Sequence, residues 1–322
     1  MKKNVFPLLI VSNIVFLIGF MWIYHVFFGT NNEQKVQVLR ENASYEFINP
    51  ILECNVDFEY YNPKRLQTQL ETYIETTIEK TQVSKISYYA RLLNNGATFW
   101  YEENIEYTPA SLIKLPLAIA FLKHVSFSSL AEKTTITQVP DDILERNFWE
   151  DVIGQWKQYS FQELFEAMLK KSDNTAALAI INFLWVDPIY RVYREFGLEN
   201  LDFSDLWSVE ISSKSYASFF RMLYNASYIP RQDSEFLLSL MTQWDFKSGI
   251  AELLPRWIKI ANKFWERKNP LNNETQLHDC GIIYAKENPY VLCVMTKGSD
   301  FDAQLESIQT ISKMIYDNIV SL

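Results

Sequence analysis

The chain has 322 residues, of which 48% are hydrophobic and 15% aromatic, and its formal net charge is −9. This is enough for a sizeable core in one or two domains, and the acidic balance argues against a nucleic-acid partner. The three cysteines, Cys54, Cys280 and Cys293, have no metal-ligand spacing, and their odd number argues against a full disulfide framework. We expect Cys280 and Cys293 as core residues.

The N-terminus predicts a membrane anchor. Lys2 and Lys3 precede Val5 to Phe28, 24 residues without Asp, Glu, Lys or Arg. At about 1.5 Å per residue this run spans a hydrocarbon core of about 30 Å. It is longer than the apolar part of a secretory signal, although a cleaved signal remains the alternative. Residues 1–28 are therefore expected to be a cytoplasmic N-terminus followed by one transmembrane helix in the cytoplasmic membrane. Because positive charges stay on the cytoplasmic side, Lys2 and Lys3 predict that the rest of the chain is extracytoplasmic.

The remaining chain divides into a polar linker at 29–57 and one domain at 58–322. Apolar spacing and a capping box at Ser160 to Glu163 predict helices over 62–82, 107–125, 160–171, 174–185, 212–225, 233–243 and 302–321. Strands are predicted over 85–93, 97–101, 256–265, 278–285 and 290–297, with a hairpin turn at 94–96. Because the strands lie at both ends, we expect an α+β fold in which an antiparallel sheet carries N- and C-terminal helices and an all-helical subdomain.

The apolar stretch 107–125 contains Ser111 and Lys114 in the order Ser-x-x-Lys. Helical positions i and i+3 share a face, so the lysine amine is expected beside the serine hydroxyl. A serine becomes a nucleophile when a neighbouring base takes its proton, and burial prepares a lysine for this by lowering its pKa. A serine in the first turn also offers its own N–H to an oxyanion. Alone, the tetrapeptide is equally explained as a helix cap before a core helix.

A second polar cluster, Ser172-Asp173-Asn174, falls between two predicted helices. Ser, Asp and Asn are all common helix caps, which explains the cluster in isolation. Following Ser-x-x-Lys, however, Ser-Asp-Asn is the second part of a three-part catalytic set. In that set, the Ser172 hydroxyl passes a proton to a leaving nitrogen, and the Asn174 amide holds a substrate carbonyl and orients the lysine.

With these blocks, the sequence resembles the class A β-lactamase-like serine hydrolases, which are relatives of the penicillin-binding proteins. The resemblance runs from about Lys85 to the C-terminus. It rests on Pro109-Ala-Ser-Leu-Ile-Lys-Leu-Pro116, Ser172-Asp-Asn-Thr-Ala176, Gly249 to Lys263, and His278-Asp-Cys-Gly-Ile-Ile-Tyr284. It implies that Ser111 is acylated, that Lys114 is its base, and that Ser172 and Asn174 shuttle a proton and hold substrate.

The resemblance also implies a role for a third segment. Lys263 would bind a substrate carboxylate, and the N–H of Glu266 would complete the oxyanion hole. Phe264 and Trp265 replace the family's Thr and Gly, so we expect Trp265 to reshape the substrate-binding cleft. The segment 186–213 also lacks the family's Glu-x-x-Leu-Asn, whose glutamate activates the deacylating water.

Two functional interpretations follow. The first is a serine hydrolase that forms an acyl-enzyme on Ser111 with β-lactams or with the D-alanyl ends of cell-wall peptides. The alternative is a catalytically impaired penicillin- or peptidoglycan-binding protein with an altered Lys-Phe-Trp segment. His278 and Asp279 are expected as strand-start residues. Neither interpretation involves a metal or a cofactor, and neither a phosphate loop nor a dinucleotide fingerprint is present.

Overall fold

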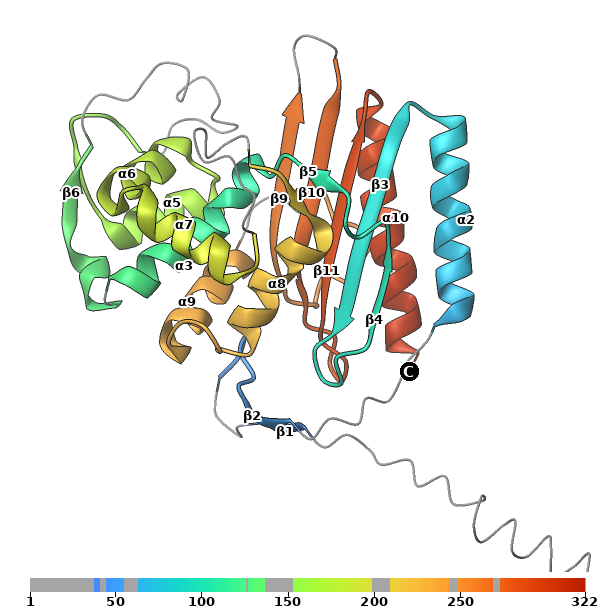
Figure 1. Cartoon of the computed structure of the whole chain (residues 1–322), viewed down its shortest axis with the longest axis horizontal. Coiled ribbons are helices and arrows are strands. Elements are labelled where there is room, and N and C mark those ends of the chain that lie inside the picture. Colours follow the sequence, from blue (N-terminus) through green and yellow to red (C-terminus); the bar gives the residue numbers. More distant parts are fainter. Residues whose placement is uncertain are drawn as a thin grey trace, which may run out of the picture.

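The computed structural model describes residues 38–40, 45–54, 63–125, 127–136, 153–198, 209–243, 248–268 and 273–321. Its centre is a five-stranded antiparallel sheet in the order β4-β3-β11-β10-β9 (Figure 1). The strands are β3 (Val83–Leu92), β4 (Thr98–Tyr101), β9 (Ile260–Lys268), β10 (Thr275–Ile283) and β11 (Tyr290–Gly298). Strands from both ends of the domain therefore pair side by side, as predicted.

Two groups of helices cover the two faces of this sheet (Figure 1). On one face lie α2 (Lys64–Lys80) and α10 (Phe301–Val320). On the other side lies the helical subdomain of α3 (Lys114–His124), α5 (Phe161–Lys170), α6 (Asn174–Leu184), α7 (Val186–Glu195), α8 (Ser213–Tyr224) and α9 (Arg231–Thr242), of which α8 and α9 pack directly on the sheet. The α+β fold with flanking helices is thus confirmed.

The period of two along a strand decides which core each side chain joins. In β11, Tyr290, Leu292 and Val294 pack with α2 and α10. The intervening Val291, Cys293 and Met295 pack with the helical subdomain. The near-continuous apolar run of this strand therefore reflects burial on both faces.

The structure corrects the predicted elements at several ends. The helix expected from residue 107 begins instead with the short β5 (Glu106–Tyr107) and the 3-10 helix η1 (Ala110–Ile113), before α3. Strand β9 starts at Ile260 because a turn occupies the preceding residues, where the Ile258 N–H donates to Pro255 O at 3.0 Å. The helix α7 was not predicted, although Ile189, Val192 and Tyr193 show helical spacing.

Two further pairs of short strands lie outside the central sheet. The strand β8 (Ile211–Ser212) pairs with β5, and β6 (Lys133–Thr135) pairs with β7 (Gln158–Ser160). A second 3-10 helix, η2, spans Phe127–Ala131. The capping box at the start of α5 is confirmed, since Ser160 and Glu163 exchange side chain to backbone hydrogen bonds.

Cys280 and Cys293 form a disulfide bond. They are directly opposite in the register of β10 and β11, and both are fully buried. The sequence analysis placed both in the core and missed the bond, because pairing depends on a strand register that spacing along the chain does not reveal.

Residues 45–50, within the range predicted as linker, form a strap across the base of the domain. The backbone N–H groups of Glu46, Phe47 and Ile48 all donate to the Glu235 carboxylate on α9, at 2.9–3.1 Å. Phe47 and Ile48 are buried, and Phe47 O accepts from the Tyr284 hydroxyl at 3.1 Å. The strands β1 (Val38–Arg40) and β2 (Ile51–Cys54) pair on either side of the strap.

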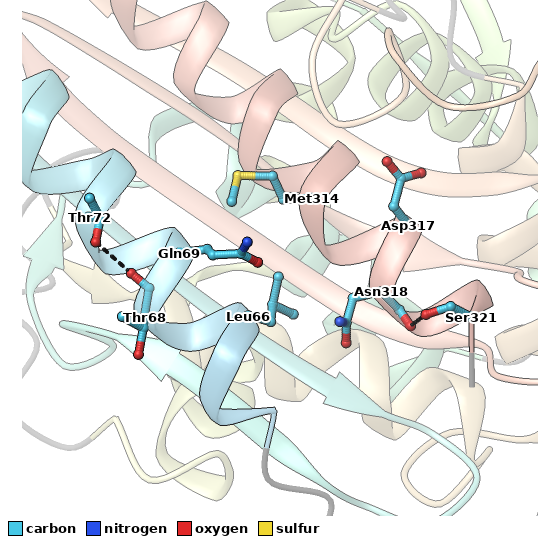
Figure 2. Close-up of a pocket in the computed structure, with 8 residues that line it drawn as sticks. All are labelled: Leu66, Thr68, Gln69, Thr72, Met314, Asp317, Asn318 and Ser321. Carbon is cyan, nitrogen blue, oxygen red and sulfur yellow. Dashed lines mark hydrogen bonds between the residues drawn. The ribbon is translucent and has the colours of Figure 1, made fainter.

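A groove of about 630 Å³ runs between α2 and α10 (Figure 2). Leu66 and Met314 contribute apolar side chains, and Gln69, Asp317 and Asn318 contribute polar ones. Leu66 belongs to the core on the α2 and α10 face, whereas Ser111 and Lys114 stand at the start of the helical subdomain. The groove is therefore separate from the predicted catalytic residues.

The predicted anchor, Val5 to Phe28, lies outside the described residues. Among the residues that are described, no single helix is long and apolar enough to cross a membrane; α6 and α7 meet that test only as a pair bent by 94°.

The contribution of the strap to the free energy of unfolding can be tested at Glu235. Glu235→Gln replaces one acceptor oxygen by an amide NH₂ group that can only donate, so partly buried N–H groups of the strap lose their acceptor. We expect the free energy of unfolding to fall by about 1–3 kcal/mol in urea denaturation. The exposed Glu252→Gln is the control and should change it by less than about 0.5 kcal/mol. Equal stability of the two variants would show that the strap contributes nothing.

Candidate active site

Ser111 and Lys114 meet at the junction of η1 and α3. Ser111 lies inside the 3-10 turn, Lys114 is the first residue of α3, and Lys114 Nζ lies 3.1 Å from Ser111 Oγ. Ser111 is half-buried, and Lys114 is fully buried. The i, i+3 spacing therefore brings the amine to the hydroxyl, through a tighter turn than the predicted α-helix.

The Lys114 amine is surrounded by oxygen atoms from Ser172 and Asn174. Besides Ser111 Oγ, it contacts Asn174 Oδ1 at 2.7 Å, Ser172 Oγ at 3.1 Å and the Ser172 carbonyl oxygen. The amide and carbonyl oxygens only accept, so they take two N–H bonds. A neutral amine then has one lone pair left for a serine hydroxyl. This arrangement suits a lysine that accepts the Ser111 proton.

Burial favours that neutral state. Loss of hydration lowers the pKa of Lys114 to about 7, against a smaller opposite effect of the Asp173 carboxylate. Near neutral pH the amine is therefore divided between its charged and uncharged forms. A general base works best when its pKa lies near the working pH.

The turn Ser172-Asp173-Asn174 caps α6 through Asp173 and also brings polar groups of Ser172 and Asn174 to the site. Ser172 follows α5 with a left-handed φ of 56°, a conformation that L-residues other than glycine seldom adopt. The Asp173 side chain caps α6 by accepting from Ala176 N at 2.8 Å, and it also accepts from Ile153 N at 3.3 Å. Asn174 is the first residue of α6. The turn thus directs both Ser172 oxygens to Lys114.

Lys263 lies on β9, the edge strand beside η1, and its side chain is fully buried. It is opposite Cys280 in the strand register, so it shares the sheet face of the disulfide. Burial and the nearby charge of Lys114 hold the pKa of Lys263 well below its usual range, and Asp279 opposes this. A charge on Lys114 thus disfavours a second charge on the neighbouring Lys263.

Trp265 and Phe264 point to opposite faces of the sheet. Trp265 is only 8% exposed and packs in the core that contains the helical subdomain, over His278 at a ring distance of 5.3 Å. Phe264 packs in the core with α2 and α10. Trp265 therefore fills space on the Lys263 face. Glu266, the residue expected to supply an oxyanion N–H, follows in β9, opposite Leu277.

His278 and Asp279, which we expected at the start of a strand, lie inside β10. Asp279 faces away from the site: it accepts hydrogen bonds from Asn262 Nδ2 at 2.9 Å and from Ile250 N at 2.8 Å. His278 faces the site, between Trp265 and Tyr107. The strand begins three residues earlier than predicted, at Thr275, so Gln276 also belongs to it.

Sequence analysis missed Gln276 and Thr108. The Thr108 N–H donates to Gln276 Oε1 at 3.2 Å, three residues before Ser111. The available signal was the period of two, since Gln276, His278 and Cys280 alternate onto one face once the strand start is known.

The structure describes only some of the glutamates in the segment 186–213 that could activate the deacylating water, because residues 199–208 are not among the described ones. Glu195 accepts a hydrogen bond from the Tyr228 hydroxyl at 2.5 Å, and Glu210 is exposed. The prediction of a missing deacylating glutamate stays a prediction.

The comparisons with known proteins agree with this geometry. The model of the β-lactamase enzyme family matches residues 69–319. The chain therefore belongs to the β-lactamase enzyme family, and it is a serine hydrolase that acts on amide bonds. The family expected from the sequence is confirmed. Among curated proteins, none matches the chain significantly.

Several solved structures share the fold. PBP-A has a TM-score of 0.70 and 22% identity, over 83% of this chain and 100% of that one. A mutant of PBP-A in an acyl-enzyme complex with penicillin G has a TM-score of 0.69 and 23% identity, over 81% and 98%. A β-lactamase from Chitinophaga pinensis has a TM-score of 0.69 and 17% identity, over 79% and 99%.

The lowered pKa of Lys114 makes the stability depend on pH. Between about pH 7 and pH 10 the folded chain keeps Lys114 neutral while the unfolded chain protonates it, so the unfolded state binds more protons. The free energy of unfolding therefore rises with pH, by at most about 1.4 kcal/mol per pH unit from this group. Wild type should gain stability relative to Lys114→Met as pH rises through this range.

Urea denaturation at a series of pH values measures this difference. The exposed Lys80→Met is the matched control, and its difference from wild type should stay flat. A flat difference for Lys114→Met as well would mean that Lys114 keeps its charge in the folded protein.

Proposed function

We propose that this chain is an acylating serine hydrolase whose nucleophile is Ser111 and whose base is Lys114. The observation that carries the proposal is the fully buried Lys114 amine, 3.1 Å from Ser111 Oγ and with its other contacts to acceptors from Ser172 and Asn174. An amine in this environment accepts a proton near neutral pH, which is what a serine nucleophile requires.

In the proposed reaction, Ser111 Oγ attacks the carbonyl carbon of an amide while its proton moves to Lys114 Nζ. The developing oxyanion is held by the N–H groups of Ser111 and Glu266. The C–N bond then breaks, and Ser172 Oγ passes its proton to the leaving nitrogen while it takes the proton held by Lys114 Nζ, 3.1 Å away. An ester on Ser111 results, and water later hydrolyses it, which returns the proton to Ser111.

The proposed substrates are β-lactams or the D-alanyl ends of cell-wall peptides. Both present a carboxylate near the scissile amide, and Lys263 on β9 is the residue that we assign to it, because a bound carboxylate would favour the protonated form of its amine. The buried Trp265 limits the space beside Lys263, so we infer a narrower cleft than a glycine would leave. The sequence lacks Glu-x-x-Leu-Asn, so we expect the ester to persist.

Intact-mass measurement after incubation with penicillin G tests the reaction. Wild type should gain the mass of one penicillin and keep it for minutes or longer. Ser111→Ala should gain nothing while remaining folded, and the exposed Ser84→Ala should behave as wild type. Because neutral Lys114 is the base, the acylation rate should rise about tenfold between pH 6 and pH 8.

Other outcomes would separate the alternatives. Rapid turnover without a detectable adduct would show that another base activates water efficiently. Absence of any adduct, together with measurable binding of cell-wall peptide, would instead support a non-catalytic binding protein.

We further propose that residues 29–322 lie outside the cytoplasmic membrane, held by Val5 to Phe28. The support is the uncharged span behind Lys2 and Lys3, together with the buried disulfide, a bond typical of oxidising compartments.

Protease treatment of intact spheroplasts checks this topology. The domain should be digested without lysis, while a cytoplasmic marker protein remains protected. Protection of the domain until lysis would place it in the cytoplasm and overturn the proposal.

A further inference from the structure

Two side chains of β10 bind both backbone polar groups of Thr108. The Thr108 N–H donates to Gln276 Oε1 at 3.2 Å, and His278 Nε2 lies 3.3 Å from Thr108 O. Gln276 and His278 are two residues apart and so share one face of the strand. They therefore hold the backbone of the same residue, on both sides of its Cα, from the sheet.

Thr108 is the residue from which the nucleophile turn starts. Strand β5 ends at Tyr107, and the carbonyl of Pro109 accepts from Leu112 N at 2.8 Å, which closes the 3-10 turn around Ser111. A shift of Thr108 would therefore move Ser111 relative to Lys114, which belongs to α3. Small displacements of reacting groups reduce catalysis strongly.

The His278 ring is held so that it can reach Thr108. It is fully buried, with Tyr107 edge-on at 5.2 Å and Trp265 tilted over it at 5.3 Å. Trp265 is also its direct cross-strand neighbour. The imidazole thus lies between the segment that leads to Ser111 and the strand that carries Lys263.

The tautomer of His278 decides which carbonyl it supplies. Burial lowers the pKa of His278 to about 4, so the ring is neutral and has one N–H. Nδ1 lies 2.7 Å from Leu277 O, which also accepts from Thr296 Oγ1 at 2.9 Å, and Nε2 lies 3.3 Å from Thr108 O. With its proton on Nε2, His278 donates to the carbonyl of Thr108.

We propose that Gln276 and His278 are positioning residues that fix Ser111 for acylation by clamping the backbone of Thr108. This inference rests on the proposed function of Ser111. It assigns to β10 a role in aligning the nucleophile, beyond its place in the sheet.

The substitutions that test the clamp come in matched pairs. His278→Gln keeps a donor near the position of Nε2, whereas His278→Asn keeps one near Nδ1 only. Gln276→Glu keeps the acceptor for Thr108 N, whereas Gln276→Leu removes it. Ser312→Ala is the control, because it removes a buried hydrogen bond to Ile250 O and involves neither His278 nor Thr108.

Stopped-flow acylation by penicillin G separates the acylation rate constant from the dissociation constant. We expect His278→Asn and Gln276→Leu each to lower the rate constant about threefold to tenfold with little change in the dissociation constant. The conservative partners and Ser312→Ala should stay within about twofold of wild type. Equal rate constants across each pair would overturn the clamp and leave the proposed function intact.

Hydrogen–deuterium exchange of the folded variants gives an independent readout. His278→Asn and Gln276→Leu should raise exchange in the peptide that covers residues 105–113, and Ser312→Ala should not. If wild type forms no adduct, the proposed function fails, and unchanged exchange in this peptide would still reject the clamp by itself.

Discussion

The burial of the Lys114 amine among acceptor oxygens is the constraint on which the site depends. An amine taken out of water must be hydrogen-bonded, and here its partners come from the end of one helix and the start of the next. The left-handed Ser172 and the capping Asp173 are the local means by which α5 and α6 deliver those partners. Stability and reactivity are thus linked, because the desolvation that costs folding energy is what keeps the amine basic near neutral pH.

The sheet divides the molecule into two cores, and only one of them faces the chemistry. Alternation along β9 assigns Lys263 and Trp265 to the site face and Phe264 to the α2 and α10 face. The replacement of the family's Thr and Gly by Phe264 and Trp265 therefore has two separate structural effects. Trp265 packs over His278 beside the site, while Phe264 adds apolar volume to the distant core.

Most of the architecture followed from local patterns. Strong helical spacing, the capping box at Ser160 and the β-rich runs at both ends predicted the elements and their arrangement, and the two short motifs predicted the contact of Ser111, Lys114, Ser172 and Asn174. The predictions that failed depended on strand register or on which residues are neighbours in space. The Cys280–Cys293 bond and the contacts of Gln276 with Thr108 arise from strand pairing between distant segments. The start of β9 was misjudged because aromatic and apolar residues continue through the turn before it.

The strap at residues 45–50 makes the folding unit larger than the unit defined by family similarity. That similarity begins at residue 69, inside α2 and well after the strap. A fragment trimmed to the similarity boundary would expose the apolar surface that Phe47 and Ile48 cover and leave the Glu235 carboxylate without the three amides it binds. Boundaries inherited from relatives thus cut through this protein's own structure, because residues 45–50 belong to the packed domain although they precede every residue that the family shares.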